Sequence, residues 1–466
     1  MDPSSEQDVP KRSSLWFSGI SHVEFSSGAF DKTTGIFCIC LSLFSFIVFW
    51  PIISQISFEE AFFTPLIPML IGLFGLFGVS ALEALKVLFI LSLMVSVIGV
   101  YLLTRELTRR QLTSILAAVL YLIPPIPIFV LSFFRQGFLE NELGSAKSFF
   151  TIVYGDGAHF LALAILPFAT IFVLRYLKNG LRFDLVFSAI LCALILLANR
   201  SQSLALFLIM IVLFITQSFF GNVRTRIQRF FSVVMLSVGL VSFWYTPNFW
   251  YLGLRYVTGE FAGNIHFLFP LPFIVFLLIL LFSFVFFARR EDRMAIFVAF
   301  LTFTVFLAII GIWFVSGHAF IPHPHRLLPN LNIFGSIVFA LFLAMIIDRV
   351  RIFSMFSQKM RSLPVRIIAS VSFGVFSFVL LTFVAYVLSP LAILVVAGSG
   401  GLWTRIRDSV LLDRQATLNL AGGNFQLIAN RSNSGQEWLG VAISLIFLTI
   451  LLFVIFKGAV DEQEAR

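Results

Sequence analysis

Apolar stretches long enough to cross a bilayer recur along this chain from residue 34 to residue 457. Hydrophobic residues make up 59% of the sequence and charged residues only 12%, and the mean hydropathy is +1.00. A lipid core offers the backbone no hydrogen-bond partners, so each crossing segment must satisfy its own N–H and C=O groups in a helix. The sequence therefore predicts an all-α polytopic membrane protein.

Taking each run of about 17 to 25 apolar residues as one span predicts twelve transmembrane helices. The apolar stretch 61–79 is left out, because Pro65, Pro68 and three glycines favour a re-entrant or surface-lying segment. The twelve spans are expected at 34–54, 84–104, 112–133, 158–175, 183–198, 203–220, 230–246, 267–288, 294–316, 331–348, 367–391 and 438–457.

The basic residues predict how the spans are oriented. With the N-terminus inside, twelve spans return the C-terminus inside, and the inner segments then hold 22 of the 32 Lys and Arg. We therefore expect an integral membrane protein of the plasma membrane with both termini cytoplasmic. Clusters such as Arg224, Arg226 and Arg229 are then anchors against anionic lipid head groups, and the net charge of +9 requires no nucleic acid partner.

Four regions follow from this topology. Residues 1–33 form a cytoplasmic tail, 34–391 form a core of eleven spans, 392–437 form an extracytoplasmic loop, and 438–466 hold the last span and a short cytoplasmic tail. Within the loop, Leu and Phe alternate around a Gly-Gly pair at 416–429, which predicts a small β-hairpin near the C-terminus.

Ionisable residues are confined to the ends of the predicted spans. None lies in the middle third of any span, whereas ion-coupled transporters usually keep such residues at membrane depth. Five of the six histidines lie in outer loops or at the outer ends of spans, and His22 alone is inside. Chemistry is therefore expected at the outer face.

Four stretches carry a resemblance to a known superfamily. They read GVYLLTRELTRRQLTSILAAVLYLIPP at 99–125, YGDGAHFLALAILPFATIFVLRYLKNG at 154–180, LCALILLANRSQSLALFLIMIVLF at 191–214 and HPHRLLPNLNIFGSI at 323–337. Their order resembles the GT-C superfamily of integral-membrane glycosyltransferases. It is closest to the membrane proteins labelled as related to 6-pyruvoyl-tetrahydropterin synthase. The resemblance implies a GT-C-like fold and transfer of a sugar from a polyprenyl-phosphate donor to an extracytoplasmic acceptor.

Such a transfer needs a carboxylate that accepts the acceptor's proton and cations that stabilise the departing phosphate. In the superfamily the first outer loop usually carries an acidic motif, often Asp-x-Asp. This chain has Glu59 and Glu60 there, which makes them the nearest candidates for the catalytic base. They could also be interfacial charges that keep the loop in water.

Further candidates follow in the next outer loop. Asp156 and His159 stand three residues apart at the entry to a span, where they could act in catalysis, although an Asp at a helix start is also an ordinary N-terminal cap. Glu140 and Glu142 could hold a divalent metal, the only cofactor that the sequence suggests, or could belong to a solvated loop.

The densest polar group is a histidine-rich turn. His318, His323 and His325 precede Arg326, whose position in the resemblance is the one expected to meet the lipid phosphate. An arginine fork suits phosphate, although a plain interfacial anchor would also place an arginine there. The histidines could bind substrate or, less simply, zinc.

Arg200 and Trp250 complete the predicted substrate-binding residues. Arg200 lies in a tight outer turn, and Trp250 belongs to an aromatic group that could stack on a sugar or form an interfacial belt. Two further functions remain open. One is a non-catalytic membrane subunit that binds lipid-linked glycan or scaffolds a partner. The other is a lipid or glycan transporter, although no internal repeat supports it.

The predicted orientation can be tested by labelling. Cysteines that replace Ser145 and Ser432 should react with an impermeant thiol reagent added to intact cells, because both loops are expected outside. A cysteine that replaces Ser357 should stay unlabelled. The reverse pattern would show that the orientation is wrong.

Overall fold

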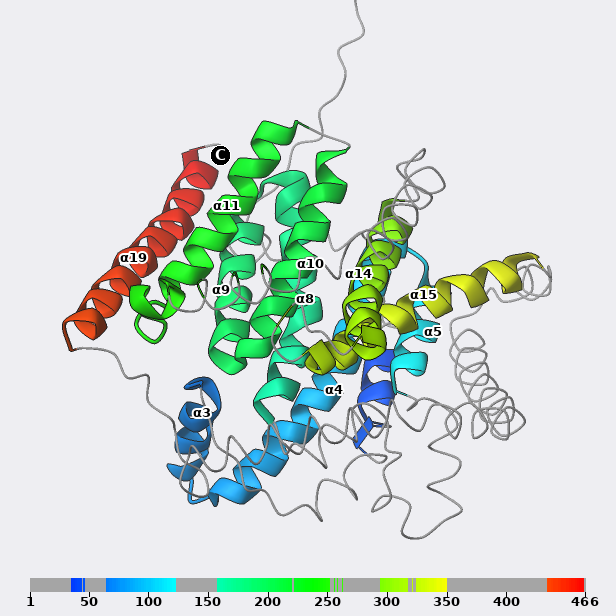
Figure 1. Cartoon of the computed structure of the whole chain (residues 1–466), viewed down its shortest axis with the longest axis horizontal. Coiled ribbons are helices and arrows are strands. Elements are labelled where there is room, and N and C mark those ends of the chain that lie inside the picture. The colour runs from blue at the N-terminus through cyan, green and yellow to red at the C-terminus, as the bar shows by residue number, and fades with distance from the viewer. Residues whose placement is uncertain are drawn as a thin grey trace, which may run out of the picture.

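The structure is a computed structural model of the 466-residue chain, shown in Figure 1. It describes residues 35–43, 45–46, 64–122, 157–219, 222–251, 294–316, 324–349 and 434–464, together with the single residues 255, 258, 262 and 321. The β-hairpin predicted at 416–429 and the spans predicted at 267–288 and 367–391 lie outside these ranges.

Every regular element in the described ranges is helical. The elements are α3 (Leu66–Gly75), α4 (Ala81–Thr108), α5 (Gln111–Leu122), α8 (Gly157–Asn179), α9 (Arg182–Ala198), α10 (Arg200–Ser218), α11 (Val223–Leu240), α14 (Met294–Ser316), the 3₁₀ helix η4 (Pro324–Leu327), α15 (Leu328–Arg349) and α19 (Ser434–Glu464).

Four helices in the described part are long and apolar enough to cross a membrane, as judged by length and composition. They are Ala81–Thr108, His159–Asn179, Arg200–Ser218 and Gly435–Phe456, in α4, α8, α10 and α19. These helices are compatible with an integral membrane protein. The total of twelve spans stays a prediction.

Helix α3 agrees with leaving 61–79 out of the spans. Its ten residues cover about 15 Å at 1.5 Å per residue, which is half of a hydrocarbon core of roughly 30 Å. A turn that contains Gly78, with a φ of 78°, then leads the chain directly into α4. Glycine suits that turn because left-handed backbone costs it little.

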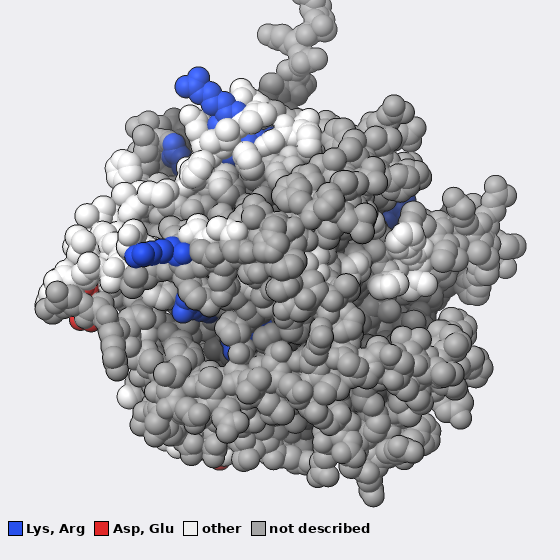
Figure 2. All heavy atoms as spheres, in the orientation of Figure 1, with Lys and Arg blue, Asp and Glu red and all other residues white. Residues whose placement is uncertain are grey.

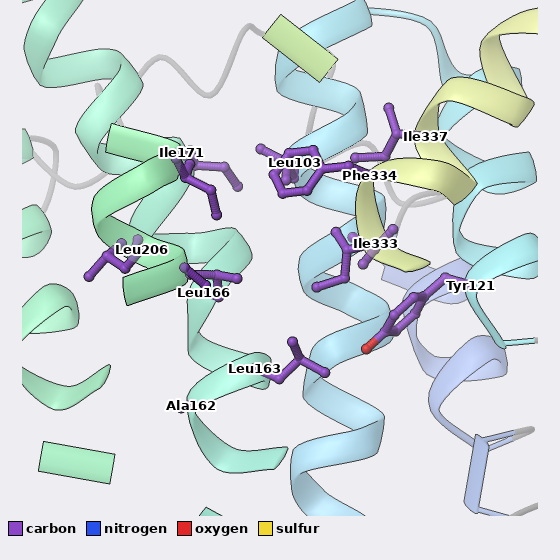
Figure 3. Close-up of a cluster of buried hydrophobic side chains, with 14 of the residues drawn as sticks. Leu103, Tyr121, Ala162, Leu163, Leu166, Ile171, Leu206, Ile333, Phe334 and Ile337 are labelled. Atoms are coloured by element: carbon purple, nitrogen blue, oxygen red, sulfur yellow. The ribbon is translucent and has the colours of Figure 1, made fainter. Parts of the chain in front are cut away.

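Helix α8 lies at the centre of the bundle, packed against α4, α9 and α10 (Figure 1). It crosses α4 where Gly99 faces Pro167 and Phe168, and a Cβ on Gly99 would stand 3.0 Å from the Phe168 ring. A small residue at a crossing lets two helices approach closely, which is how helices associate in lipid. Around this crossing, α4, α5, α8, α10 and α15 contribute buried side chains to one core (Figure 3).

The structure of α11 shows that two predictions were wrong: the bounds of the span at 230–246 and the role of its arginines as lipid anchors alone. The span predicted at 230–246 is a helix over 223–240, since the Asn222 side chain caps it by accepting the Arg224 backbone N–H. Arg226 and Arg229 are not simply lipid anchors. Their guanidinium groups donate to main-chain carbonyls at the end of α8, with Arg226 2.7 Å from the Lys178 oxygen and Arg229 2.8 Å from the Leu177 oxygen. Such carbonyls lack helical partners and favour cations.

Helix α19 packs on α11 at the edge of the bundle (Figure 1). The Ser444 hydroxyl donates to the Gly239 carbonyl at 3.1 Å and accepts the Phe243 N–H at 2.8 Å, just where α11 ends. Gly440 brings α19 so close that a Cβ there would overlap the Ser242 carbonyl oxygen. A glycine is therefore required for this contact.

Gly440→Ala should lower the free energy of unfolding by about 1–3 kcal/mol, because the added methyl group would meet main chain that cannot rotate away. Thermal unfolding of the purified protein in detergent measures this. The matched control is Gly435→Ala in the same helix, where a Cβ would meet nothing within 4 Å. Equal midpoints for both variants would contradict the close approach of α19 to α11.

Candidate functional site

Interhelical hydrogen bonds group the helix ends into two sets. Helices α8, α10 and α15 begin at one end of the bundle, where His159 is buried, and α4 and α8 terminate at the other, where Arg175 is buried. We call these the His159 end and the Arg175 end. The alternation agrees with the predicted order of outer and inner helix ends, and the His159 end is the one predicted to lie outside.

At the His159 end, α8 is joined to α10 by a buried polar contact. The Gln202 amide nitrogen lies 2.9 Å from His159 Nε2, and both side chains are almost completely shielded from solvent. His159 stands in the first turn of α8, and Gln202 is the third residue of α10. A buried imidazole and a buried carboxamide each require such a partner.

Arg326 approaches the same turn of α10 from another element. It is carried by η4, and its guanidinium donates to the Ser201 hydroxyl at 3.2 Å. Ser201 precedes Gln202, so His159 and Arg326 contact neighbouring residues of one helical turn. Two of the residues predicted from the sequence are therefore brought together.

The turn between α9 and α10 holds this arrangement in place. The Asn199 side chain caps α10 by accepting the N–H groups of Ser201 and Gln202, at 2.9 and 3.1 Å. The Thr64 hydroxyl, just before α3, donates to the Ala198 carbonyl at 2.7 Å. The tight outer turn predicted at Asn199 therefore joins three segments, namely the end of α9, the start of α10 and the residues just before α3.

Arg200 and Trp250 lie next to this turn through aromatic contacts. The Arg200 guanidinium carbon is 5.2 Å from the centre of the Phe249 ring, within the range of a cation–π interaction. Trp250 packs at 5.8 Å from Phe249 and 5.7 Å from Tyr245, whose hydroxyl donates to the Leu196 carbonyl. Tyr245, Phe249 and Trp250 therefore form one packed cluster beside Arg200, which we call the aromatic platform.

The helix starts at this end differ in their charge. Within the first turns of α4 and α19 stand Glu83 and Glu437, and Glu83 forms a reciprocal capping box with Ser80. The first turns of α10 and α15, by contrast, contain no acidic residue. Their positive dipole ends and the guanidinium of Arg326 together favour an anion.

Two residues at this end were missed by the sequence analysis. Gln202 and Asn330 are completely buried, and Gln202 Oε1 and both polar atoms of Asn330 have no hydrogen-bond partner in the described structure. In the sequence, each is a carboxamide at the start of an apolar run, and such a residue is typical of the end of any transmembrane span. Their burial depends on the packing of three helices and could not be derived from the pattern.

The other predicted site residues cannot be compared with this geometry. Glu59, Glu60, Glu140, Glu142, Asp156, His318 and His323 lie outside the described residues, and of His325 only the backbone, in η4, is described. Among described side chains, no group of three or more His, Cys, Asp or Glu could hold a metal ion. The divalent metal at Glu140 and Glu142 stays a prediction.

The Arg175 end has its own polar cluster. Arg175 of α8 donates from Nε, at 3.1 Å, and from Nη2 to the two carboxylate oxygens of Glu106 in α4, and Asp184 of α9 is buried nearby. A two-pronged ion pair of this kind fixes the relative position of two helices. In Figure 2 the visible Lys and Arg are spread from the top of the molecule to its middle, whereas the little red that is visible lies at the left edge and the bottom.

Comparisons with known proteins add no relative: no protein family, curated protein or solved structure matches this chain.

The contact between α8 and α10 can be measured by a double-mutant cycle. His159→Leu and Gln202→Leu should each cost about 1–3 kcal/mol of unfolding free energy, because each leaves a buried partner behind. The double variant should cost less than the sum by at least about 0.5 kcal/mol. Ser237→Ala is the control, since the Ser237 hydroxyl donates to Val233 of its own helix, α11, and forms no described hydrogen bond with His159 or Gln202. Coupling of His159→Leu with Ser237→Ala as large as with Gln202→Leu would contradict a direct contact.

Proposed function

We propose that this protein is a GT-C-like membrane glycosyltransferase that transfers a sugar from a polyprenyl-phosphate donor to an extracytoplasmic acceptor. It would lie in the plasma membrane with both termini in the cytoplasm, so that the His159 end faces outwards. The observation that carries the proposal is the convergence of His159 and Arg326 on the first turn of α10.

The chemistry assigns a role to each group. The acceptor's hydroxyl would lose its proton to Glu59 or Glu60 as its oxygen attacks the anomeric carbon. The bond from that carbon to the phosphate oxygen would break, and polyprenyl phosphate would leave. Its charge would be stabilised by Arg326 and by the unneutralised starts of α10 and α15.

Arg200 and the aromatic platform beside it extend this assignment. Arg200 is exposed while it lies over the Phe249 ring, so it can meet an anionic head group at the rim. Trp250, which is half-buried and packs against the buried Tyr245, offers an apolar face of the kind on which sugar rings stack. His159 would hold Gln202 and the turn of α10 in position.

A second candidate is a non-catalytic membrane subunit that binds lipid-linked glycan or scaffolds a partner. It is favoured by the first outer loop, where Glu59-Glu60 stands in place of an Asp-x-Asp motif. Arg326 and the starts of α10 and α15 would serve lipid-phosphate binding equally in either candidate. The two differ only in whether the glutamates are needed.

Glu59→Gln or Glu60→Gln should lower turnover by about 100-fold, because glutamine keeps the size of the side chain and loses the proton-accepting charge. Binding of a polyprenyl-phosphoryl hexose should survive in that variant. Arg326→Ala should mainly weaken binding of the donor. The measurements are release of polyprenyl phosphate and donor affinity in detergent.

Arg224→Ala is the control, because Arg224 is exposed at the opposite end of the bundle. It should change neither quantity. Full function in the cell with both glutamates replaced would favour the non-catalytic subunit. Unchanged donor binding in Arg326→Ala would contradict the glycosyltransferase and the glycan-binding form of the subunit, and would leave only a scaffold.

A further inference from the structure

Two buried carboxamides occupy equivalent places at the His159 end. Gln202 is the third residue of α10 and Asn330 is the third residue of α15. Both have an exposed fraction of 0%. The Gln202 amide nitrogen contacts His159, and its amide oxygen has no partner in the described structure.

These carboxamides differ from several buried threonines of the core, although the hydroxyls of Ser42, Ser45 and Thr113 and one oxygen of Asp184 are likewise buried without a described partner. Thr104, Thr170 and Thr302 are buried too, but each hydroxyl donates to the carbonyl four residues earlier in its own helix, at 2.7–2.8 Å. A buried polar group without a partner is costly, so proteins rarely keep one without a use. Asn330 has two such atoms in the described structure, and leucine would fill a similar volume at no such cost.

One hydrogen bond joins the two turns that carry them. Arg326 lies four residues before Asn330, and its guanidinium reaches Ser201, the neighbour of Gln202. Along the chain, Gln202 is therefore next to one residue of this bond and Asn330 is four residues from the other, at the two helix starts where an anion is favoured. Three elements, α10, η4 and α15, contribute to this arrangement.

The chemistry of a carboxamide differs from that of a phosphate site. A phosphate oxygen only accepts hydrogen bonds, whereas a neutral amide presents both a donor and an acceptor. A sugar hydroxyl also donates and accepts, so it can satisfy both atoms at once. The guanidinium and the carboxamides are thus suited to adjacent parts of one ligand, a phosphate and the sugar attached to it.

We propose that Gln202 and Asn330 are specificity-determining residues that bind hydroxyl groups of the sugar on a lipid-linked donor. The proposal rests on the proposed function, since it places the sugar beside the phosphate bound by Arg326. It implies that the protein discriminates among sugars by hydroxyl position. A site built to hydrogen-bond a hydroxyl rejects an analogue that lacks it far more strongly than an apolar pocket would.

The experiment compares two ligands on the full-length protein in detergent. The probes are undecaprenyl phosphate and its mannosyl, glucosyl and galactosyl esters, and the measured quantity is the ratio of the glycosyl to the bare-lipid affinity. For wild type, at least one sugar should raise affinity about 10-fold or more, as expected for two neutral hydrogen bonds. A deoxy analogue of that sugar should lose most of the gain.

Asn330→Leu should reduce this ratio by at least about 3-fold, because the Gln202 carboxamide remains, while it leaves affinity for undecaprenyl phosphate unchanged. Its thermal midpoint should stay the same or rise, because the leucine replaces a carboxamide without a described partner. The matched control is Thr113→Val in α5, since Thr113 Oγ1 is likewise buried and unpartnered among described residues but lies at the Arg175 end. Thr113→Val should keep the wild-type ratio.

The outcomes separate the two proposals. If wild type binds undecaprenyl phosphate through Arg326 but gains nothing from any sugar, the carboxamides do not bind hydroxyls and the proposed function survives. An unchanged ratio in Asn330→Leu, or an equal loss of both affinities, likewise overturns the role of Asn330. If neither lipid binds, both proposals fall.

Discussion

Helix α8 is the element on which the described structure depends, because polar contacts hold both of its ends. At one end His159 meets Gln202 of α10, and at the other Arg175 forms a two-pronged ion pair with Glu106 of α4. Between them, Gly99 allows α4 to cross closely at Pro167. Apolar packing alone would let helices slide past one another in lipid, whereas polar contacts at both ends fix the position of each helix along its neighbours.

Fixing α8 in this way determines what can gather at each end. The carbonyls at its C-terminus accept hydrogen bonds from Arg226 and Arg229, so the cations of α11 are used in joining helices there. The start of α8 instead lies beside the start of α10, with Arg326 bonded to that same turn. At one end arginines therefore join the end of α8 to α11, and at the other an arginine joins η4 to the start of α10.

Hydropathy predicted most described helices because lipid allows few alternatives: the predicted span 294–316 coincides with α14, and 183–198 differs from α9 by one residue. It misplaced α11, because a helix that begins among arginines has no apolar start to detect. The sequence analysis expected chemistry at the outer face and named His159 and Arg326 among its candidates, and both contact the first turn of α10. It missed Gln202 and Asn330, since burial at a helix start depends on neighbours distant in the sequence, and the role of Glu59 and Glu60 stays a prediction.

An ion pair and a pair of carboxamides show how satisfied and unsatisfied buried groups differ. At the Arg175 end both oxygens of Glu106 meet the guanidinium, although one oxygen of the nearby Asp184 has no described partner. At the His159 end, Asn330 and one side of the Gln202 amide are buried without a described partner, and unsatisfied polar groups are expensive in a low-dielectric interior. The satisfied pair of Arg175 and Glu106 stabilises the fold as it stands. A cluster with spare donors and acceptors beside an arginine is stabilised further only when a ligand supplies matching groups.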